Sequence, residues 1–214
     1  MLKSKVNVQE KRGQDTKERI IAAAIDLFSQ EGYTGASIRD ITGAVGIKES
    51  SLYHYFSSKQ EIIEIIYASF KNALALERQA HESIPTVIKP YDSYLLLQNN
   101  LIFLKKMFDK PFMRKVYRVI SMERYRDKQA FEIMSYDIYQ SIAATHEIMF
   151  KKMIAAGIMK PLLDPDILSI EYTYAVMGIF GDYNILKYYE KSTTAIEDLM
   201  FEYVKFFWDR VKNI

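Results

Sequence analysis

Apolar residues recur along most of this 214-residue chain at intervals of three and four, which is the spacing of one face of an α-helix. No segment of the sequence alternates apolar and polar residues in the manner of a half-buried strand, and no Asn-Gly or Asp-Gly pair marks a tight hairpin. The sequence contains neither internal repeats nor low-complexity segments. The pattern therefore predicts an all-α protein.

Capping residues, glycines and prolines divide this pattern into nine predicted helices. A start is expected at Ser58, because Glu61 three positions later completes a capping box, and an end is expected at Gly32. The other expected caps are Asp15, Ser37, Asp164 and Thr194. The predicted helices cover residues 15–32, 37–45, 48–56, 58–82, 91–109, 111–122, 127–156, 165–190 and 194–211. Three compact helices thus precede a long connector and five further helices.

Residues 37–59 have the features that a helix-turn-helix needs. Two short helices flank Gly46, which can adopt a positive φ in the turn at no steric cost. Small residues, Thr42 with Gly43 and Ala44, stand where the two helices would cross. The apolar residues that would lock the helices together are Ile38, Ile41, Val45, Ile47 and Leu52. The polar outer face of the second helix carries Lys48, Glu49, Ser50, Ser51, Tyr53 and His54.

Such a motif suits binding to DNA. The second helix can enter the major groove and present residues 48–51 to base edges. Phosphates can be held by backbone N–H groups near Ser37 and by the side chains of Tyr53, His54, Tyr55 and Lys59. Two interpretations of Glu49 stay open: its carboxylate accepts a hydrogen bond from cytosine N4, or it points to solvent. Tyr53 and Tyr55 can either pack or contact phosphate.

The sequence of residues 16–65 resembles the TetR (tetracycline repressor) family of transcription regulators. The segments that carry the resemblance are LFSQEGY, SIRDIT, VGI and SLYHYFSSKQEI. It implies DNA contacts at Ser37, Arg39, Lys48, Glu49, Ser50, Ser51, Tyr53, His54, Tyr55 and Lys59. It implies core positions at Ile38, Ile41, Gly46, Leu52 and Phe56. Two residues depart from the family pattern, because Lys48 replaces a usual Ser or Thr cap and Thr42 replaces a usual Ala.

We expect three regions along the chain. Residues 1–14 form a flexible basic tail, which either reaches a phosphate backbone or is a solvated, frayed end. Residues 15–60 form the helix-turn-helix DNA-binding domain, and residues 61–214 form a helical ligand-binding and dimerisation domain. The resemblance implies that the last two long helices pair with those of a second subunit as a four-helix bundle.

The C-terminal region holds candidates for a ligand pocket and for a dimer interface. The pocket candidates are Tyr94, Met107, Tyr117, Tyr125, Tyr136, Tyr139, Met149, Met153, Tyr174 and Met177. The interface candidates are Ile170, Tyr174, Gly178, Gly181, Ile196, Leu199, Met200, Tyr203 and Phe207. Aromatic and methionine side chains at such spacing also suit a plain core, and both helix faces can instead pack within one protomer, so these alternatives stay open.

Composition narrows the classes of function. The net charge of +2 demands no nucleic acid, and the lack of cysteine excludes disulfides and thiolate metal sites. No apolar run approaches the ~18 residues of a membrane span. The three histidines lie far apart, and there is no metalloprotease helix, glycine-rich phosphate loop or Gly-x-Ser-x-Gly motif. We therefore expect a cytoplasmic protein without membrane contact, metal or cofactor, and not an enzyme.

The resulting hypothesis is a sequence-specific DNA-binding transcription regulator that acts as a homodimer on a near-palindromic operator. It is expected to be a repressor that an unknown small-molecule effector, apolar or aromatic, releases by binding the DNA-incompetent state better. The alternative is an all-helical protein-interaction or small-molecule-binding scaffold without DNA binding.

Overall fold

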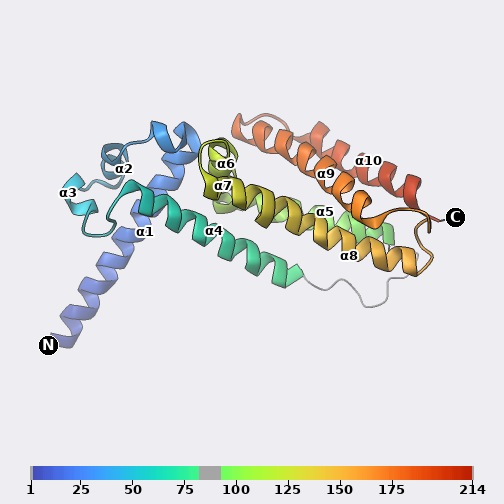
Figure 1. Cartoon of the computed structure of the whole chain (residues 1–214). Helices are drawn as coiled ribbons and strands as arrows, with labels where there is room; N and C mark the ends of the chain where they lie inside the picture. The colour runs from blue at the N-terminus through green and yellow to red at the C-terminus, as the bar shows by residue number, and fades with distance from the viewer. Residues whose placement is uncertain (1, 82–92, 214) are drawn as a thin grey trace. The chain divides into compact units, whose positions relative to one another are not determined.

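A computed structural model of the protein describes residues 2–81 and 93–213, with side chains for 13–79 and 93–213. All of its named elements are helices (Figure 1). They are α1 Leu2–Gly35, α2 Ile38–Val45, α3 Glu49–Leu52, α4 Lys59–His81, α5 Ser93–Asp109, α6 Pro111–Glu123, α7 Lys128–Glu132, the π-helix η2 Ile133–Gln140, α8 Ser141–Ala155, α9 Pro165–Tyr188 and α10 Thr194–Val211. Because α7, η2 and α8 follow one another without a break, these described residues hold the nine predicted helices and confirm the all-α class.

Two of the early helices differ in length from the prediction. Helix α1 begins at Leu2 rather than at Asp15, and Gly32 interrupts it with φ 76° and ψ 167° before one more turn reaches Gly35. Helix α3 ends at Leu52 rather than at Phe56, because residues 53–55 continue as a hydrogen-bonded turn. In that turn the backbone N–H groups of Tyr55 and Phe56 both donate to the Leu52 carbonyl, at 2.8 and 3.0 Å.

The predicted helix caps are confirmed at some positions and shifted at others. Asp164 caps α9, since its Oδ1 accepts from the Asp166 N–H at 2.9 Å, and Pro165 opens the helix as predicted. The cap of α10 is Thr193 rather than Thr194. At the start of α4 the Ser58 hydroxyl accepts from the Glu61 backbone N–H, as predicted. The Glu61 carboxylate, however, accepts from the backbone N–H of Ser57 rather than from that of Ser58.

The predicted end of the connector helix at residue 82, the loop at 83–90 and the helix start at residue 91 lie outside the described residues.

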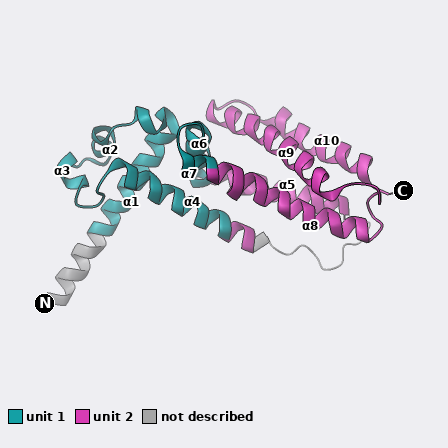
Figure 2. Ribbon diagram, in the orientation of Figure 1, with its two compact units in different colours: residues 1–75, 111–131 teal, residues 76–110, 132–214 magenta. Residues whose placement is uncertain are grey.

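The chain forms two compact units (Figure 2). Unit 1 comprises residues 1–75 and 111–131, and unit 2 comprises residues 76–110 and 132–214. Unit 1 therefore contains α6 and α7, which the sequence prediction assigned to the C-terminal domain. The predicted boundary after residue 60 stays a prediction.

Contacts between α1 and α6 explain why α6 joins the first unit. The Lys115 ammonium pairs with the Asp26 carboxylate, and Arg118 donates to the Ser29 carbonyl. Where Gly32 interrupts α1, the Glu123 carboxylate accepts from the Tyr33 backbone N–H at 2.9 Å. These bonds join residues about ninety positions apart in the sequence, so helical periodicity does not reveal them.

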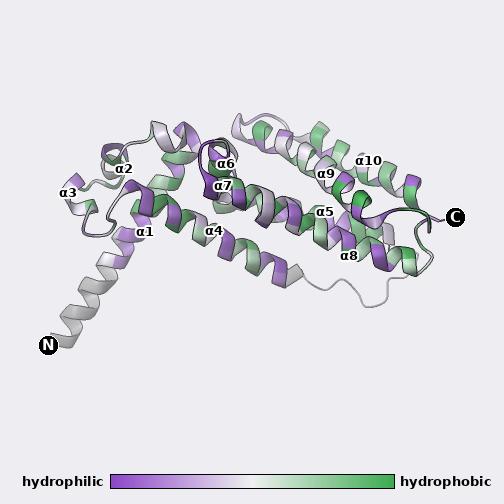
Figure 3. Cartoon of the chain, in the orientation of Figure 1, coloured by the Kyte–Doolittle hydropathy of each residue, from purple (hydrophilic) through white to green (hydrophobic). Residues whose placement is uncertain are grey.

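Unit 2 packs α5, α8, α9 and α10 around an aromatic core. Tyr172, Phe150 and Phe207 are buried, and their ring centroids lie 4.5 to 5.8 Å apart. Apolar residues recur as stripes along these helices, interrupted by polar positions (Figure 3). The segment after α8 is held against the end of α10, because the Lys160 N–H donates to the Val211 carbonyl at 3.0 Å.

Candidate nucleic-acid interface

A reciprocal cap fixes the start of α2. The Ser37 hydroxyl accepts from the Asp40 backbone N–H at 3.2 Å, and the Asp40 carboxylate accepts from the Ser37 N–H at 2.8 Å. The Ser37 hydroxyl also donates to the Asp40 carboxylate at 2.5 Å. This bond, followed by the one from the Ser37 N–H, holds the pKa of the Asp40 carboxyl below its usual value. Ser37 is also a predicted phosphate contact, but its hydroxyl is already engaged in the cap of α2.

The turn between α2 and α3 depends on Gly46. Its φ of +75° lies in the left-handed region, where a side chain is strained. In this geometry the N–H groups of Gly46 and Ile47 both donate to the Thr42 carbonyl, at 2.9 and 3.0 Å. The sequence prediction for Gly46 is thus confirmed.

Apolar contacts and one long-range bond lock the motif. Ile41, Leu52 and Phe56 are at most 1 % exposed, so the inner faces of both short helices lie within the core. From α1, the Arg19 guanidinium donates to the Val45 carbonyl at 2.6 Å, at the C-terminal end of α2. The direction of α3 is consequently fixed by packing on one side and by α1 on the other.

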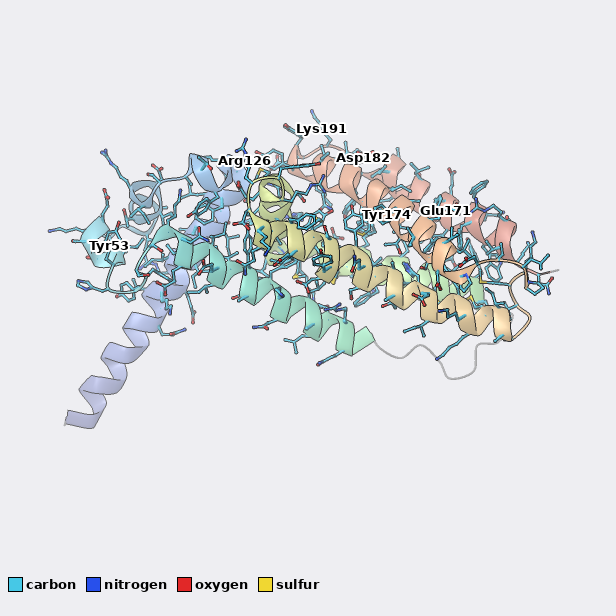
Figure 4. The ribbon with its side chains drawn as sticks, in the orientation of Figure 1. Tyr53, Arg126, Glu171, Tyr174, Asp182 and Lys191 are labelled. Atoms are coloured by element: carbon cyan, nitrogen blue, oxygen red, sulfur yellow. The ribbon has the colours of Figure 1, made fainter. Side chains whose placement is uncertain are left out.

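The outer surface of α3 is polar and open. Lys48, Glu49 and Ser50 are exposed, and Tyr53, which follows the helix, is 55 % exposed (Figure 4). The predicted weak cap at Lys48 is confirmed, because its side chain makes no capping hydrogen bond. The other predicted DNA contacts also lie at the surface: Arg39 and His54 are exposed, and Ser51 and Tyr55 are half-buried.

Lys59 has a structural role that the sequence did not indicate. Its ammonium donates to the carbonyls of Tyr33 and Ala36, at 2.8 and 2.9 Å, and lies 4.2 Å from the centroid of the Tyr33 ring. A cation at the carbonyl end of α1 is favourable. Two of its three N–H donors are therefore engaged within the protein, and at most one remains for a phosphate.

The pocket candidates do not share one environment. In unit 2, Met107, Met149, Met153 and Met177 are buried, whereas Tyr94 and Tyr139 are half-buried. Tyr174, Tyr136 and Tyr125 are 59, 50 and 84 % exposed, so they do not line an enclosed cavity of the protomer. Tyr117 and Tyr125 belong to unit 1.

Unit 2 contains a buried polar cluster that the sequence did not predict. The imidazole of His146, which is fully buried, lies 2.7 Å from Thr173 Oγ1 and 3.0 Å from Asn100 Oδ1. Burial lowers the pKa of His146 to about 3, so the ring is neutral at physiological pH. His146 is thus a buried residue whose two ring nitrogens both have partners within the protein. Its partners stand on α5 and α9, and no local pattern joins them to it.

The interface candidates divide between the surface and the core. Ile170, Tyr174, Gly178 and Leu199 are exposed, and Gly181, Ile196 and Tyr203 are half-buried. Met200 and Phe207 are at most 2 % exposed, so they belong to the core of the protomer and are not available to a partner. Exposed apolar residues that the prediction omitted are Ile167, Ile185 and Phe206. These residues are at helical spacing from Ile170, Tyr174 and Leu199, so the sequence pattern could have placed them on the same helix faces.

No described helix is long and apolar enough to cross a membrane. Among the residues with described side chains, no three His, Cys, Asp or Glu residues are grouped closely enough to hold a metal ion.

This locked helix pair with an exposed polar second helix defines a helix-turn-helix motif. Residues 20–66 match the family model described as bacterial regulatory proteins, tetR family. Over this segment the resemblance to the TetR family seen in the sequence motifs is confirmed.

The sequence relatives match only part of the chain. The HTH-type transcriptional repressor NicS of Pseudomonas putida is 36 % identical over 75 residues, which is 33 % of this chain and 35 % of NicS. The negative transcriptional regulator IcaR of the Staphylococcus aureus biofilm operon icaADBC is 50 % identical over 48 residues, or 22 % of this chain and 26 % of IcaR. The chain thus matches about a third or less of the length of these curated relatives.

Solved structures share the fold over nearly the whole chain. A TetR transcriptional regulator from Chloroflexus aurantiacus superposes with a TM-score of 0.70 at 17 % identity, covering 95 % of this chain and 100 % of its own. The ketosteroid transcriptional regulator KstR2 of Mycobacterium tuberculosis gives a TM-score of 0.66 at 16 % identity, covering 92 % and 95 %. At this identity the likeness concerns the fold alone.

Proposed function

We propose that this protein is a dimeric transcription repressor that binds a near-palindromic operator through α3 and is released by a small molecule bound in unit 2. The observation that carries the proposal is the exposed polar surface of α3, held in a fixed direction by the buried Ile41, Leu52 and Phe56. A short helix of this kind can enter the major groove, while its flanking residues hold phosphates. A protein that binds operator DNA must be in the compartment that contains the DNA, which agrees with the expected cytoplasmic location.

Gel retardation on the DNA that flanks the protein's own gene tests this binding. Tyr53→Ala removes an exposed aromatic residue at the end of α3 and is expected to weaken binding about tenfold, as the loss of one good contact does. Tyr125→Ala is the matched control, because it removes an even more exposed tyrosine from the same unit, after α6. Equal affinity of both variants and the parent contradicts a DNA contact at Tyr53. No retarded fragment at all contradicts DNA binding and leaves the helical scaffold as the function.

The dimer proposal is supported by the exposed face of α9. Ile167, Ile170, Tyr174 and Ile185 are more than half exposed along this helix, with charged residues such as Glu171 and Asp182 beside them (Figure 4). Such a contiguous apolar face is rare on a monomer and is typical of an interface.

Two glycines on α9 support a second copy of the chain as the occupant of this face. A Cβ added at Gly178 or Gly181 meets nothing within 4 Å in the protomer, so packing inside the protomer does not require glycine there. Each costs about 1 kcal/mol relative to alanine in a helix interior. A partner helix that approaches closely would use the missing side chains.

Sedimentation velocity tests the dimer. Gly178→Leu places a bulky side chain on the exposed face without a clash inside the protomer, so the protomer is expected to stay folded while the dimer dissociates. Lys151→Leu, a change to leucine at an exposed position on α8, is expected to leave the dimer intact. A parent chain that sediments as a monomer at micromolar concentration contradicts the proposal.

The effector proposal rests on the interior of unit 2. Its core holds buried methionines and aromatic rings together with a hydrogen-bonded polar cluster, His146 with Thr173 and Asn100, and small-molecule sites have this composition. KstR2, a structural neighbour, is a ketosteroid regulator by name. A ligand releases DNA only if it binds the DNA-incompetent state better. Screening apolar and aromatic compounds for those that raise the melting temperature and weaken operator binding tests this; compounds that do the first alone contradict it.

A further inference from the structure

Four acidic residues lie in or next to the helix-turn-helix, between residues 37 and 64, all of which the structure describes. Asp40 accepts from the N–H and hydroxyl of Ser37, and Glu61 accepts in the same way from Ser57, at 2.6 and 2.7 Å. Glu64 accepts from the Gln60 amide at 3.0 Å. Three of the four carboxylates thus have a structural partner within the protein.

Glu49 is the exception among these four. It is exposed in the first turn of α3, and its carboxylate has no hydrogen-bond or ion-pair partner among the residues whose side chains the structure describes. The neighbouring cation Lys48 is the N-cap residue of α3, has an extended backbone, and forms no ion pair with Glu49. An unpaired negative charge therefore stands on the surface that the proposed function brings to DNA.

A carboxylate on this surface disfavours most of the DNA that it meets. Phosphates repel it, and the major-groove edges of guanine and thymine offer it only acceptors. Adenine sets an N7 acceptor beside its N6 donor. Cytosine presents the N4 donor alone, and an acidic side chain that accepts from cytosine N4 is a known pairing. The charge is tolerated where this donor stands opposite it and is costly elsewhere.

We propose that Glu49 is a specificity-determining residue: it selects a cytosine in each half-site of the operator and weakens binding to all other duplexes by charge repulsion. This inference rests on the proposed function. Glu49 would discriminate in two ways, by a favourable contact with the correct base and by an unfavourable one with incorrect sequences. In a dimer, both copies of Glu49 would require a cytosine at symmetric positions.

Selection from a pool of randomised duplexes tests the inference with the full-length chain. The parent is expected to enrich a near-palindrome with an invariant cytosine at one position in each half. Replacing that cytosine by thymine, which puts the O4 acceptor in place of the N4 donor, is expected to weaken parent binding roughly 5- to 150-fold per half-site. This half of the experiment needs no protein variant.

The protein variants are Glu49→Gln and Glu64→Gln, which remove the same charge. Glu49→Gln is expected to lose the cytosine preference at that position, to favour adenine there, and to bind random duplex several-fold more tightly than the parent. Glu64→Gln is expected to keep the selected motif unchanged, because its partner lies within α4. Circular dichroism and melting temperature verify that both variants are folded.

The outcomes separate the inference from the proposed function. If Glu49→Gln enriches the same motif as the parent, or if both glutamine variants change affinity equally, Glu49 selects no base and the inference is wrong although DNA binding stands. If the parent enriches no duplex, the proposed function fails, and the inference fails with it.

Discussion

The buried His146 makes the stability of the protein depend on pH in a predictable direction. Its pKa is lowered to about 3 in the folded protein by burial, whereas an unperturbed histidine has a pKa of roughly 6.5. The unfolded chain therefore binds a proton that the folded chain excludes. The stability associated with the neutral ring is fully present above about pH 6.5 and is lost as the pH falls from there toward 3.

The magnitude follows from the two pKa values. Between pH 8 and pH 5, protonation of the unfolded chain at His146 lowers the free energy of unfolding by about 2 kcal/mol. Solvent does not screen this contribution, because the imidazole is 0 % exposed. Partly exposed acids such as Asp109, whose pKa is lowered, add a loss of the same sign at lower pH. That loss is common to the parent and to variants at position 146, so it cancels in their comparison.

Urea unfolding of the parent and of His146→Gln at pH 8 and pH 5 measures the effect. Glutamine is neutral and can still bond Thr173 and Asn100, so the variant is expected to lose about 2 kcal/mol less than the parent between the two pH values. His54→Gln, at an exposed position, is the control and should follow the parent. If parent and His146→Gln lose the same free energy within about 0.5 kcal/mol, His146 is not buried as a neutral ring and the reasoning is refuted.

Three further substitutions test a turn, a helix cap and a buried hydrogen bond. Gly46→Ala forces a side chain into φ +75° and should lower the free energy of unfolding by roughly 1 kcal/mol, measured by thermal unfolding; an unchanged melting temperature would argue against a left-handed turn. Ser37→Ala removes the cap of α2, with an expected loss of about 1 kcal/mol, while Ser37→Thr, which keeps a hydroxyl that can both accept from the Asp40 N–H and donate to the Asp40 carboxylate, should recover most of it. Tyr183→Phe deletes the 2.5 Å hydrogen bond from the buried Tyr183 hydroxyl to Asp109, and chemical unfolding should show a loss of about 1.5 kcal/mol; a neutral result would mean that this bond contributes nothing.

The helix-turn-helix was predictable because its determinants are local. Ile41 and Leu52 bury at helical spacing, and Gly46 takes the positive φ that the turn requires. Nearly all of the information lies within residues 37–59. The polar outer face of α3 follows from the same pattern, since positions that do not face the core face solvent.

Long-range pairing explains what the sequence did not show. Helix α6 joins unit 1 through Glu123 and Lys115, whose partners lie far away on α1. The engagement of Lys59 with the carbonyl end of α1 is likewise invisible to a local pattern. His146 reads as an isolated polar residue until α5 and α9 supply its partners.

The interface candidates show a further limit of periodicity. Phe206 and Phe207 are adjacent aromatic residues of α10, yet Phe206 is 62 % exposed and Phe207 is buried. A helical pattern that is apolar over a wide arc does not tell which edge of the arc faces the core. Only the packing of α10 against α8 and α9 decides this, through the rings of Phe150 and Tyr172.

The salt dependence of operator affinity tests the central claim, that the α3 surface binds duplex DNA. Fluorescence anisotropy between 50 and 300 mM salt, roughly the range in which such binding weakens steeply, should give a linear fall of log K with log salt. Lys48→Gln removes one exposed cation per protomer and should make the slope of a dimer shallower by roughly 2. Affinity that does not change with salt, or a slope that Lys48→Gln leaves unaltered, would contradict the account.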